Sequence, residues 1–241
     1  MYHRFEIKDR KLVNAGGEVS MPGVWDTSDV MGKPWFLKLS GSKILDAGCR
    51  DGWFSLMFSQ MGCHASAMDW DDLPRRREVK ALTDLDYRFH HETIYLASNI
   101  PEKFDIVWIS DVVCHLLNPI QALSQLRQVT QDWIYVGFDR AEVSGELVTH
   151  YGAWAKGSPV MALGFRDYPN LHTVESMARL LDIAGFTDME LVGDYTIKLD
   201  NVPDGWGDSK TSRVNHVMRA KPGSQFIPER DVVGWKYENR E

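Results

Sequence analysis

From Lys43 onward the sequence alternates short apolar runs, several of them ending in Asp or Gly, with longer stretches in which apolar residues recur at helical spacing. This alternation is typical of βαβ units and therefore of a mainly parallel sheet covered by helices. The expected strands are residues 43–46, 64–69, 87–94, 104–109, 133–138, 186–199 and 214–219. Because the last two form an antiparallel pair, the sequence predicts an α/β fold with a doubly wound, mainly parallel seven-stranded sheet and an antiparallel last strand.

Four stretches between these strands are expected to be helical. One begins near Trp53, and a charged one covers residues 71–82. Asn118 followed by proline is typical of a capped helix start, and Thr173 caps a further helix that Gly185 ends. Within the charged stretch, Arg75, Arg76 and Arg77 are expected to form a solvated helix face.

The length of 241 residues, with 44% hydrophobic residues, suits one domain with a full core. Residues 41–220 are expected to form this domain. Residues 1–40, punctuated by Gly and Pro, are interpreted as an N-terminal cap, and residues 221–241 as a C-terminal tail. Residues 139–170 separate a strand from the next helix by more than an ordinary loop, so they are expected to form a lid or acceptor-binding insertion.

Composition excludes several classes of function. The net charge of −7 argues against non-specific binding to a polyanion. Three cysteines without a CxxC pair favour reduced thiols, with neither a disulfide framework nor a metal site. No apolar run approaches the roughly 18 residues that cross a bilayer, and the start lacks a secretory signal, so a soluble cytoplasmic protein without a membrane partner is expected. The oligomeric state leaves no trace in the sequence.

The segment ILDAGCRDGWFS, Ile44 to Ser55, predicts a strand, a glycine turn and a helix. Gly48 and Gly52 are expected to let the backbone approach a ligand. Asp69 ends the next strand, 23 positions after Asp46, where an acid accepts hydrogen bonds from ribose hydroxyls. A dinucleotide site favours G-x-G-x-x-G, but Arg50 replaces its middle glycine, and Asp46 and Asp51 would repel a pyrophosphate. A cationic nucleoside without phosphate, S-adenosylmethionine, suits this turn better.

The same residues resemble the first motif of Rossmann-like, class I S-adenosylmethionine-dependent methyltransferases, in which Asp46, Gly48 and Gly52 match the acidic and glycine positions and Asp69 matches the ribose-binding acid. The segments Phe104–Pro119 and Leu180–Val192 are similar to the family's fourth-strand motif and to the helix and strand that follow its core. The resemblance implies a Rossmann-like fold and methyl transfer. In finer detail, MPG near the start, GCRDGWFS and VVCHLLNP resemble the branch that includes wobble-uridine tRNA methyltransferases and uncharacterised relatives.

Further site residues follow from their places beside the strand ends. Trp70, Glu92, Thr93, Ser110 and Asp111 join the turn as expected cofactor-binding residues, although surface or turn-forming roles are alternatives for the last four. Asp111, His115 and Asp139 follow the fourth and fifth strands and are the expected catalytic residues. His115 is the first candidate for a general base, oriented by Asp111 one helical turn earlier, if the acceptor must lose a proton. Its alternative is a helix-packing or capping role.

The methyl acceptor has no readable motif. The insertion contributes the expected substrate-binding residues His150, Tyr151, Trp154 and Arg166, and Trp25 and Trp35 are expected to add aromatic walls. A small-molecule O- or N-methyltransferase is the leading interpretation, and a tRNA-modifying enzyme is the alternative. A non-catalytic S-adenosylmethionine-binding module, or a carboxylated S-adenosylmethionine held by Arg50 or Arg166, also remains open.

Overall fold

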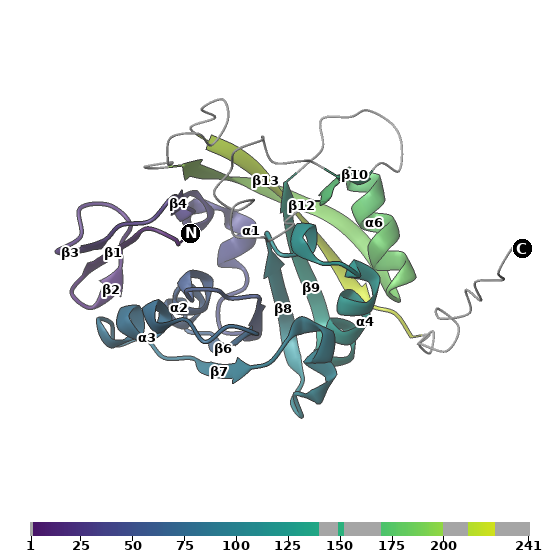
Figure 1. Ribbon diagram of the computed structural model, residues 1–241, viewed down its shortest axis with the longest axis horizontal. Helices are drawn as coiled ribbons and strands as arrows, with labels where there is room; N and C mark the ends of the chain where they lie inside the picture. Colours follow the sequence, from purple (N-terminus) through teal and green to yellow (C-terminus); the bar gives the residue numbers. More distant parts are fainter. Residues whose placement is uncertain (1, 140–148, 152–169, 200–211, 225–241) are drawn as a thin grey trace, which may run out of the picture.

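The computed structural model describes residues 2–139, 149–151, 170–199 and 212–224, and its main element is an eight-stranded sheet of order β4-β12-β13-β9-β8-β5-β6-β7 (Figure 1). Neighbours from β9 to β7 pair in parallel, whereas β13 is antiparallel to both β9 and β12. The predicted doubly wound, mainly parallel fold is thereby confirmed. The strands are β4 (Trp25–Asp26), β5 (Lys43–Ala47), β6 (His64–Asp69), β7 (Arg88–His91), β8 (Phe104–Ser110), β9 (Thr130–Asp139), β12 (Phe186–Leu199) and β13 (Ser212–Pro222).

The strand count differs from the predicted seven because β4 adds an edge strand. Only two of its residues pair, with Lys198 and Leu199 of β12, so it carries no periodic pattern. The third strand is also shorter than the expected residues 87–94, since Ile94 already begins the 3-10 helix η2 (Ile94–Asn99). This shortening leaves Glu92 and Thr93 in the loop beyond the strand end.

Helices cover the two faces of the sheet, and each face has its own core. Alternate residues of β8 supply both: Ile106 and Trp108 join one cluster, Val107 and Ile109 the other. In Figure 1, α2 and α3 lie to the left of β8 and β9, and α4 and α6 to their right. These helices are α2 (Trp53–Gln60), α3 (Pro74–Ala81), α4 (Pro119–Val129) and α6 (Val174–Ile183).

The predicted helix signals are confirmed in detail. The Asn118 side chain accepts a hydrogen bond from the backbone N–H of Gln121, and the Thr173 hydroxyl accepts one from Ser176, each at 3.1 Å. Beyond α6, Gly185 has a φ of +89°, the left-handed conformation that ends a helix.

The basic run in α3 differs from its prediction because Arg76 faces the protein. The side chain of Arg76 is 3% exposed, and its guanidinium carbon lies 3.5 Å from the centroid of the Phe89 ring on β7. One of its nitrogens also donates to the carbonyl oxygen of Arg50, at 3.0 Å. The expected solvated face is therefore wrong at Arg76, which stabilises the loop that carries Arg50. It is also wrong at Arg75, whose side chain is 15% exposed and donates to the carbonyls of His3 and Pro22.

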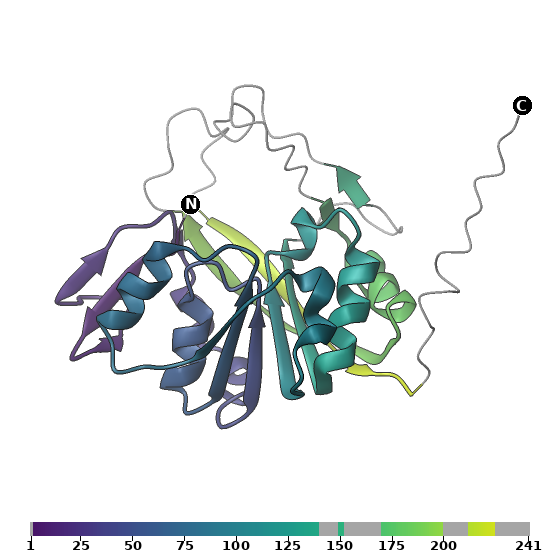
Figure 2. The same cartoon turned by 60° about the horizontal axis from the view of Figure 1, so that its bottom comes forward.

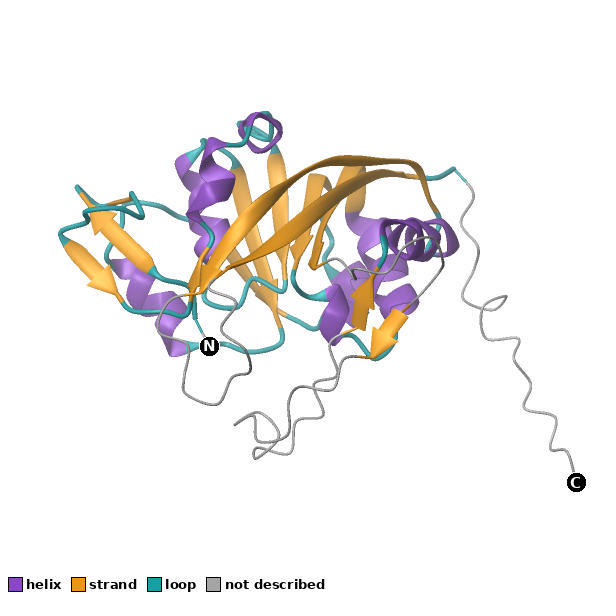
Figure 3. Cartoon of the chain, turned by 90° about the horizontal axis from the view of Figure 1, so that it is seen from above, coloured by secondary structure: helices purple, strands orange, loops and turns teal. Residues whose placement is uncertain are grey.

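The N-terminal segment forms a small antiparallel sheet, seen apart from the main sheet in Figure 3. A pair of hydrogen bonds joins it to α2, because the Gln60 amide both accepts from the Leu12 N–H and donates to the Leu12 carbonyl. Its strands are β1 (Phe5–Lys8), β2 (Lys11–Leu12) and β3 (Val19–Met21), and after β4 follow the 3-10 helix η1 (Ser28–Gly32) and α1 (Pro34–Leu37).

Two short strands, β10 (Thr149–Tyr151) and β11 (Asn170–His172), pair outside the main sheet. β10 lies within the expected insertion of residues 139–170 and β11 begins at its last residue, and most of the insertion lies outside the described residues. Figure 2 shows the end of β12 (green) and the start of β13 (yellow) close to the N-terminus. None of the helices in the described part of the chain has the length and apolar character needed to cross a bilayer.

Candidate cofactor and acceptor site

The turn between β5 and α2 departs from ordinary backbone geometry at three positions. Gly48, Arg50 and Gly52 have φ values of +78°, +48° and +83°. A Cβ on Gly48 would lie 2.5 Å from a methyl carbon of Val112, and one on Gly52 would lie 2.6 Å from the hydroxyl oxygen of Tyr87. Protein atoms therefore occupy the space beside each glycine that a ligand was expected to approach, so left-handed backbone and tight packing account for both glycines.

Asp69 connects this turn to the end of β6. One carboxylate oxygen accepts a hydrogen bond from the backbone N–H of Arg50, at 2.7 Å, and the other accepts from Asp71, at 3.0 Å. A carboxylate offers about four acceptor positions, so these two bonds orient the side chain without exhausting it. Asp69 is thus fixed beside the glycine turn with acceptor positions left over, and its role as the ribose-binding acid stays a prediction.

The ends of β6 and β7 bring the other predicted nucleoside residues to the same place. The Glu92 N–H donates to the Asp69 carbonyl, at 3.1 Å, and the Thr93 N–H donates to the Glu92 carboxylate, at 2.9 Å. Trp70 is 67% exposed, an unusual state for so large an apolar side chain. The exposed indole of Trp70, beside the oriented carboxylate of Asp69, provides a flat surface on which a nucleobase could stack.

Asp46 lies under the turn and is 3% exposed. The hydroxyl of Ser55 donates to its carboxylate, at 2.6 Å. Burial and, to a smaller extent, the charge of the nearby Asp69 raise the pKa of Asp46 to about 7, against the opposing effects of the Ser55 hydrogen bond and the charge of His3. Ionisation of the Asp46 carboxyl group beside the turn is therefore unfavourable unless a cation lies nearby.

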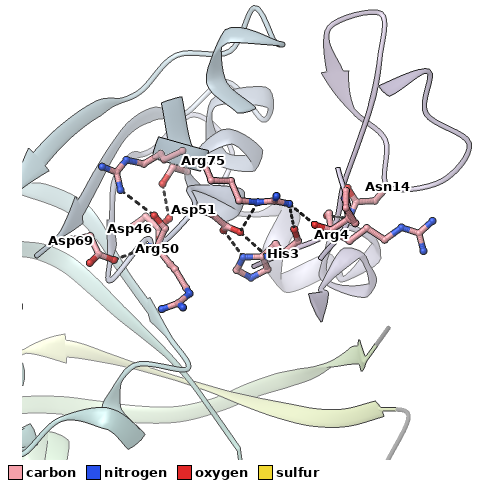
Figure 4. Close-up of polar contacts among 11 residues, drawn as sticks. His3, Arg4, Asn14, Asp46, Arg50, Asp51, Asp69 and Arg75 are labelled. Carbon is pink, nitrogen blue, oxygen red and sulfur yellow. Dashed lines mark hydrogen bonds and ion pairs between the residues drawn. The ribbon is translucent and has the colours of Figure 1, made fainter. Parts of the chain in front are cut away.

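Asp51 is wholly buried and turned toward the N-terminal segment (Figure 4). Its two oxygens accept from the backbone N–H of His3 and contact the Nδ1 of His3, both at 2.6 Å, and Arg75 lies 3.9 Å away. Burial alone would raise the pKa of Asp51, but the charge and hydrogen bonds of His3, together with Arg75, lower it below its ordinary value. Asp51, which was predicted to bind the cofactor, therefore binds His3 and Arg75 of the protein and is turned away from Asp69.

A second polar cluster closes the ends of β8 and β9. Asp111 has a φ of +57°, and its two oxygens accept from Arg213, at 2.9 Å, and from Asn215, at 2.6 Å. Ser110 shares a hydrogen bond of 2.6 Å with the hydroxyl of the buried Tyr195. Four strands thus meet at Asp111, and an acid is held there in a conformation that only surrounding contacts stabilise.

Arg213 also faces the third predicted catalytic residue. Its guanidinium lies 4.0 Å from the Asp139 carboxylate at the end of β9. Burial alone would lower the pKa of Arg213, but the charges of Asp111 and Asp139 outweigh it and raise the pKa. The three side chains are each about a quarter to a third exposed, so the cluster is open on one side.

His115 is exposed at the end of the 3-10 helix η3 (Val113–His115). The expected arrangement placed Asp111 one helical turn before it, but Asp111 precedes the helix and its carboxylate binds β13 residues. Both residues nevertheless follow β8, on the edge of the sheet that also carries the glycine turn.

The expected acceptor residues are only partly described. His150 and Tyr151 lie in β10, of which the backbone alone is described, and Trp154 and Arg166 lie outside the described residues. Trp25 is close to Arg50, whose guanidinium carbon lies 5.8 Å from its ring centroid. Trp35 instead stacks on Trp108 and lines a cavity of about 380 Å³ beside the first residues of β8 and β9, so it lies away from the glycine turn.

Sequence reasoning missed His3, Arg213 and Asn215. His3 is 48 positions from Asp51, and Arg213 is 102 positions from Asp111, so no local pattern connects either pair. Arg213 and Asn215 share one face of β13, but Arg213 precedes the expected strand of residues 214–219, so the two-residue spacing gave no signal for the pair.

Comparisons with known proteins agree with this geometry. Residues 31–191 match a family model described as a methyltransferase domain. Among curated proteins, the chain is similar to ubiquinone biosynthesis O-methyltransferases of Azotobacter vinelandii (28% identity over 92 residues) and Pseudomonas entomophila (29% over 87 residues). These matches cover 36% and 34% of this chain and only 39% and 37% of the relatives' own lengths.

Solved structures are similar in fold. Magnesium protoporphyrin IX methyltransferase of Synechocystis, with bound S-adenosylhomocysteine, has a TM-score of 0.53 and 15% identity, over 78% of both chains. The 1,6-didemethyltoxoflavin-N1-methyltransferase of Burkholderia thailandensis, with its substrate and S-adenosylhomocysteine, has a TM-score of 0.55 and 16% identity, over 82% of this chain and 80% of that one. Identity at this level shows a shared fold.

Proposed function

Because the chain belongs to the methyltransferase domain family, we propose that it is an S-adenosylmethionine-dependent methyltransferase with a small-molecule acceptor. The observation that carries the proposal is Asp69, whose carboxylate is held against the glycine turn by the N–H groups of Arg50 and Asp71. A ribose needs such a preset acceptor for its two hydroxyls.

The charge of the turn supports the cofactor. Asp69 lies close enough to Asp46 for its charge to raise the pKa of Asp46. A ligand with phosphates would add to this repulsion, whereas a sulfonium and an ammonium relieve it. We assign Asp46, Arg50 and Asp69 to the cofactor site, and Gly48 and Gly52 supply the left-handed backbone that shapes its turn. Trp70, Glu92, Thr93, Ser110 and Asp111 border it, and Asp51 holds the turn in shape.

When bound, S-adenosylmethionine supplies a methyl group already activated by the sulfonium. The protein then has to hold the acceptor in line and exclude water. Asp111 and Asp139, bridged by Arg213, are placed to orient an acceptor hydroxyl or amine at the ends of β8 and β9. His115 is the proposed base for an acceptor that must lose a proton.

Small-molecule chemistry is supported by the relatives, whose names describe methylation of a ubiquinone precursor, a porphyrin and a toxoflavin precursor. In this chain the acidic composition and the inward-facing Arg76 reduce the basic surface that RNA needs. We place O- or N-methylation of a small molecule in the cytosol first. The finer resemblance to wobble-uridine tRNA methyltransferases makes tRNA the second candidate.

The test is calorimetric titration of the full chain with S-adenosylhomocysteine and NAD, beside an Asp69→Ala variant. We expect micromolar binding of S-adenosylhomocysteine, at least ten-fold weaker in the variant, and none of NAD. A matched control is Asp105→Ala, at the opposite end of the parallel strands. Binding of NAD alone would refute the proposal.

A second assay separates the acceptor classes. Labelled S-adenosylmethionine is incubated with the protein and either a metabolite extract or total tRNA, and the methylated product is traced. Label in tRNA would favour the second candidate. Cofactor binding with no labelled product in either pool would favour a non-catalytic module.

A further inference from the structure

The first residues of the described chain lie against the proposed cofactor turn, not out in solvent. The His3 side chain is 12% exposed. Its ring stacks on Trp53 of α2, with centroids 5.9 Å apart, and packs edge-on against Phe54 and Trp25. Trp53 directly follows the turn, so the ring of His3 fills the corner where the turn becomes a helix.

Polar contacts fix His3 in this corner (Figure 4). Its backbone N–H and its Nδ1 both contact the Asp51 carboxylate, each at 2.6 Å, and its carbonyl accepts from Arg75, at 3.1 Å. Asp51 is wholly buried. A buried carboxylate that loses its partner is strongly destabilising, so the turn and the His3 segment have to hold each other in place.

The His3 segment is also tied to β4. The Arg4 N–H donates to the Trp25 carbonyl and the Val24 N–H donates to the Tyr2 carbonyl, at 2.8 and 2.9 Å. A Cβ on Gly23 would lie 2.2 Å from the His3 carbonyl oxygen, so the two backbones approach as closely as only glycine permits. Because β4 pairs with β12, the segment joins the turn to the far edge of the sheet.

Arg50 connects this arrangement to the ribose acid. Its backbone N–H donates to Asp69, while its guanidinium carbon lies 6.0 Å from the Tyr2 ring centroid and 5.8 Å from that of Trp25. Arg50 immediately precedes Asp51 and has a strained, left-handed backbone. A displacement of Asp51 would therefore move the N–H that orients Asp69.

We propose that His3 is a positioning residue for the cofactor site: by holding Asp51, it keeps the turn in the shape that orients Asp69. The inference rests on the proposed function and adds that the N-terminal segment is an integral part of the nucleoside site. Docking of residues 2–4 and binding of the nucleoside then stabilise each other.

The experiment compares His3→Ala with His3→Asn, whose amide can occupy the position of Nδ1, and with the control His64→Ala, an exposed histidine at the start of β6. Hydrogen exchange of the unliganded turn, residues 47–53, is measured first. S-adenosylhomocysteine affinity is then measured at a temperature where circular dichroism shows each variant folded. If His3→Ala does not fold, His3→Gln, whose amide lies near Nε2 instead, replaces it.

We expect faster exchange of the turn in His3→Ala and, if about a tenth of the molecules keep the competent turn, roughly ten-fold weaker binding. His3→Asn is expected to restore most of both properties, and His64→Ala to match the wild type. Wild-type exchange and affinity in His3→Ala would overturn the inference. Failure of the wild type to bind S-adenosylhomocysteine would instead refute the proposed function, and the exchange measurement would still decide the role of His3.

Discussion

Replacing Asp46 by Asn should make the unliganded protein more stable at alkaline pH. Asp46 is buried under the turn, accepts a hydrogen bond from Ser55, and has its pKa raised to about 7, first by burial. Asn is nearly isosteric and its carbonyl can accept the same hydrogen bond. The variant therefore removes the charge with little change in packing.

The magnitude follows from linkage between protonation and folding. Below about pH 4 the carboxyl group is protonated in both the folded and the unfolded chain. Between that pH and about 7 the unfolded chain releases its proton while the folded chain keeps it, so the free energy of unfolding falls as the pH rises. A shift from 3.8 to about 7 corresponds to about 4 kcal/mol, which is fully lost above pH 7.

The assay is urea unfolding of the wild type and Asp46→Asn at pH 5 and pH 8. The stability advantage of the variant should be larger at pH 8 than at pH 5 by about 3 kcal/mol. Ser55→Ala is the companion variant, because the Ser55 hydrogen bond lowers the pKa of Asp46. Without that bond the pKa of Asp46 should rise, so the variant should lose more stability than the wild type between pH 5 and pH 8. An advantage independent of pH would refute the reasoning.

Three other substitutions test separate parts of the fold and site. In Gly137→Ala the new Cβ would lie 2.3 Å from the Ser110 hydroxyl oxygen, so the melting temperature should fall by an amount equivalent to about 1–3 kcal/mol. Asn118→Ala removes the α4 cap and should lower the free energy of unfolding in urea by about 1 kcal/mol. Arg213→Gln should reduce kcat with a radiolabelled methyl donor and leave S-adenosylhomocysteine affinity within about two-fold, because Arg213 binds Asp111 on the acceptor side; a pure loss of affinity would contradict that placement.

The sequence predicts those parts of the fold in which each element has its own periodic pattern. The strands that end at Asp69 and Leu199 have the expected bounds, because buried runs and their flanking polar residues mark both ends. By contrast, β4 consists of Trp25 and Asp26 and exists only because Lys198 and Leu199 pair with it. Such an edge strand depends on the finished sheet and leaves no local signal.

In the candidate site, too, some residue contacts could be predicted from the sequence and others could not. The juxtaposition of Asp46 and Asp69 could be predicted because they lie at the carboxyl ends of neighbouring parallel strands, and such ends meet at one edge of a sheet. The partner of Asp51 could not be predicted, since His3 reaches it only after the N-terminal segment has folded over the turn. Asp51 carries the same charge as its neighbours in the motif, and only the fold shows that it binds the protein.

The partners of the acids explain where a cation would be favoured. Asp51 contacts His3 and Arg75, and Asp111 contacts Arg213, so their charge is compensated within the protein. Asp46 is instead held by a neutral hydroxyl, and the charge of Asp69 raises its pKa. A sulfonium and an ammonium bound there would lower the pKa of Asp46, which is about half protonated at pH 7, so binding at that pH should release about half a proton per site. Titrations with S-adenosylmethionine in buffers of different ionisation enthalpy measure that proton, and binding of the cation without release would show that Asp46 is not its partner.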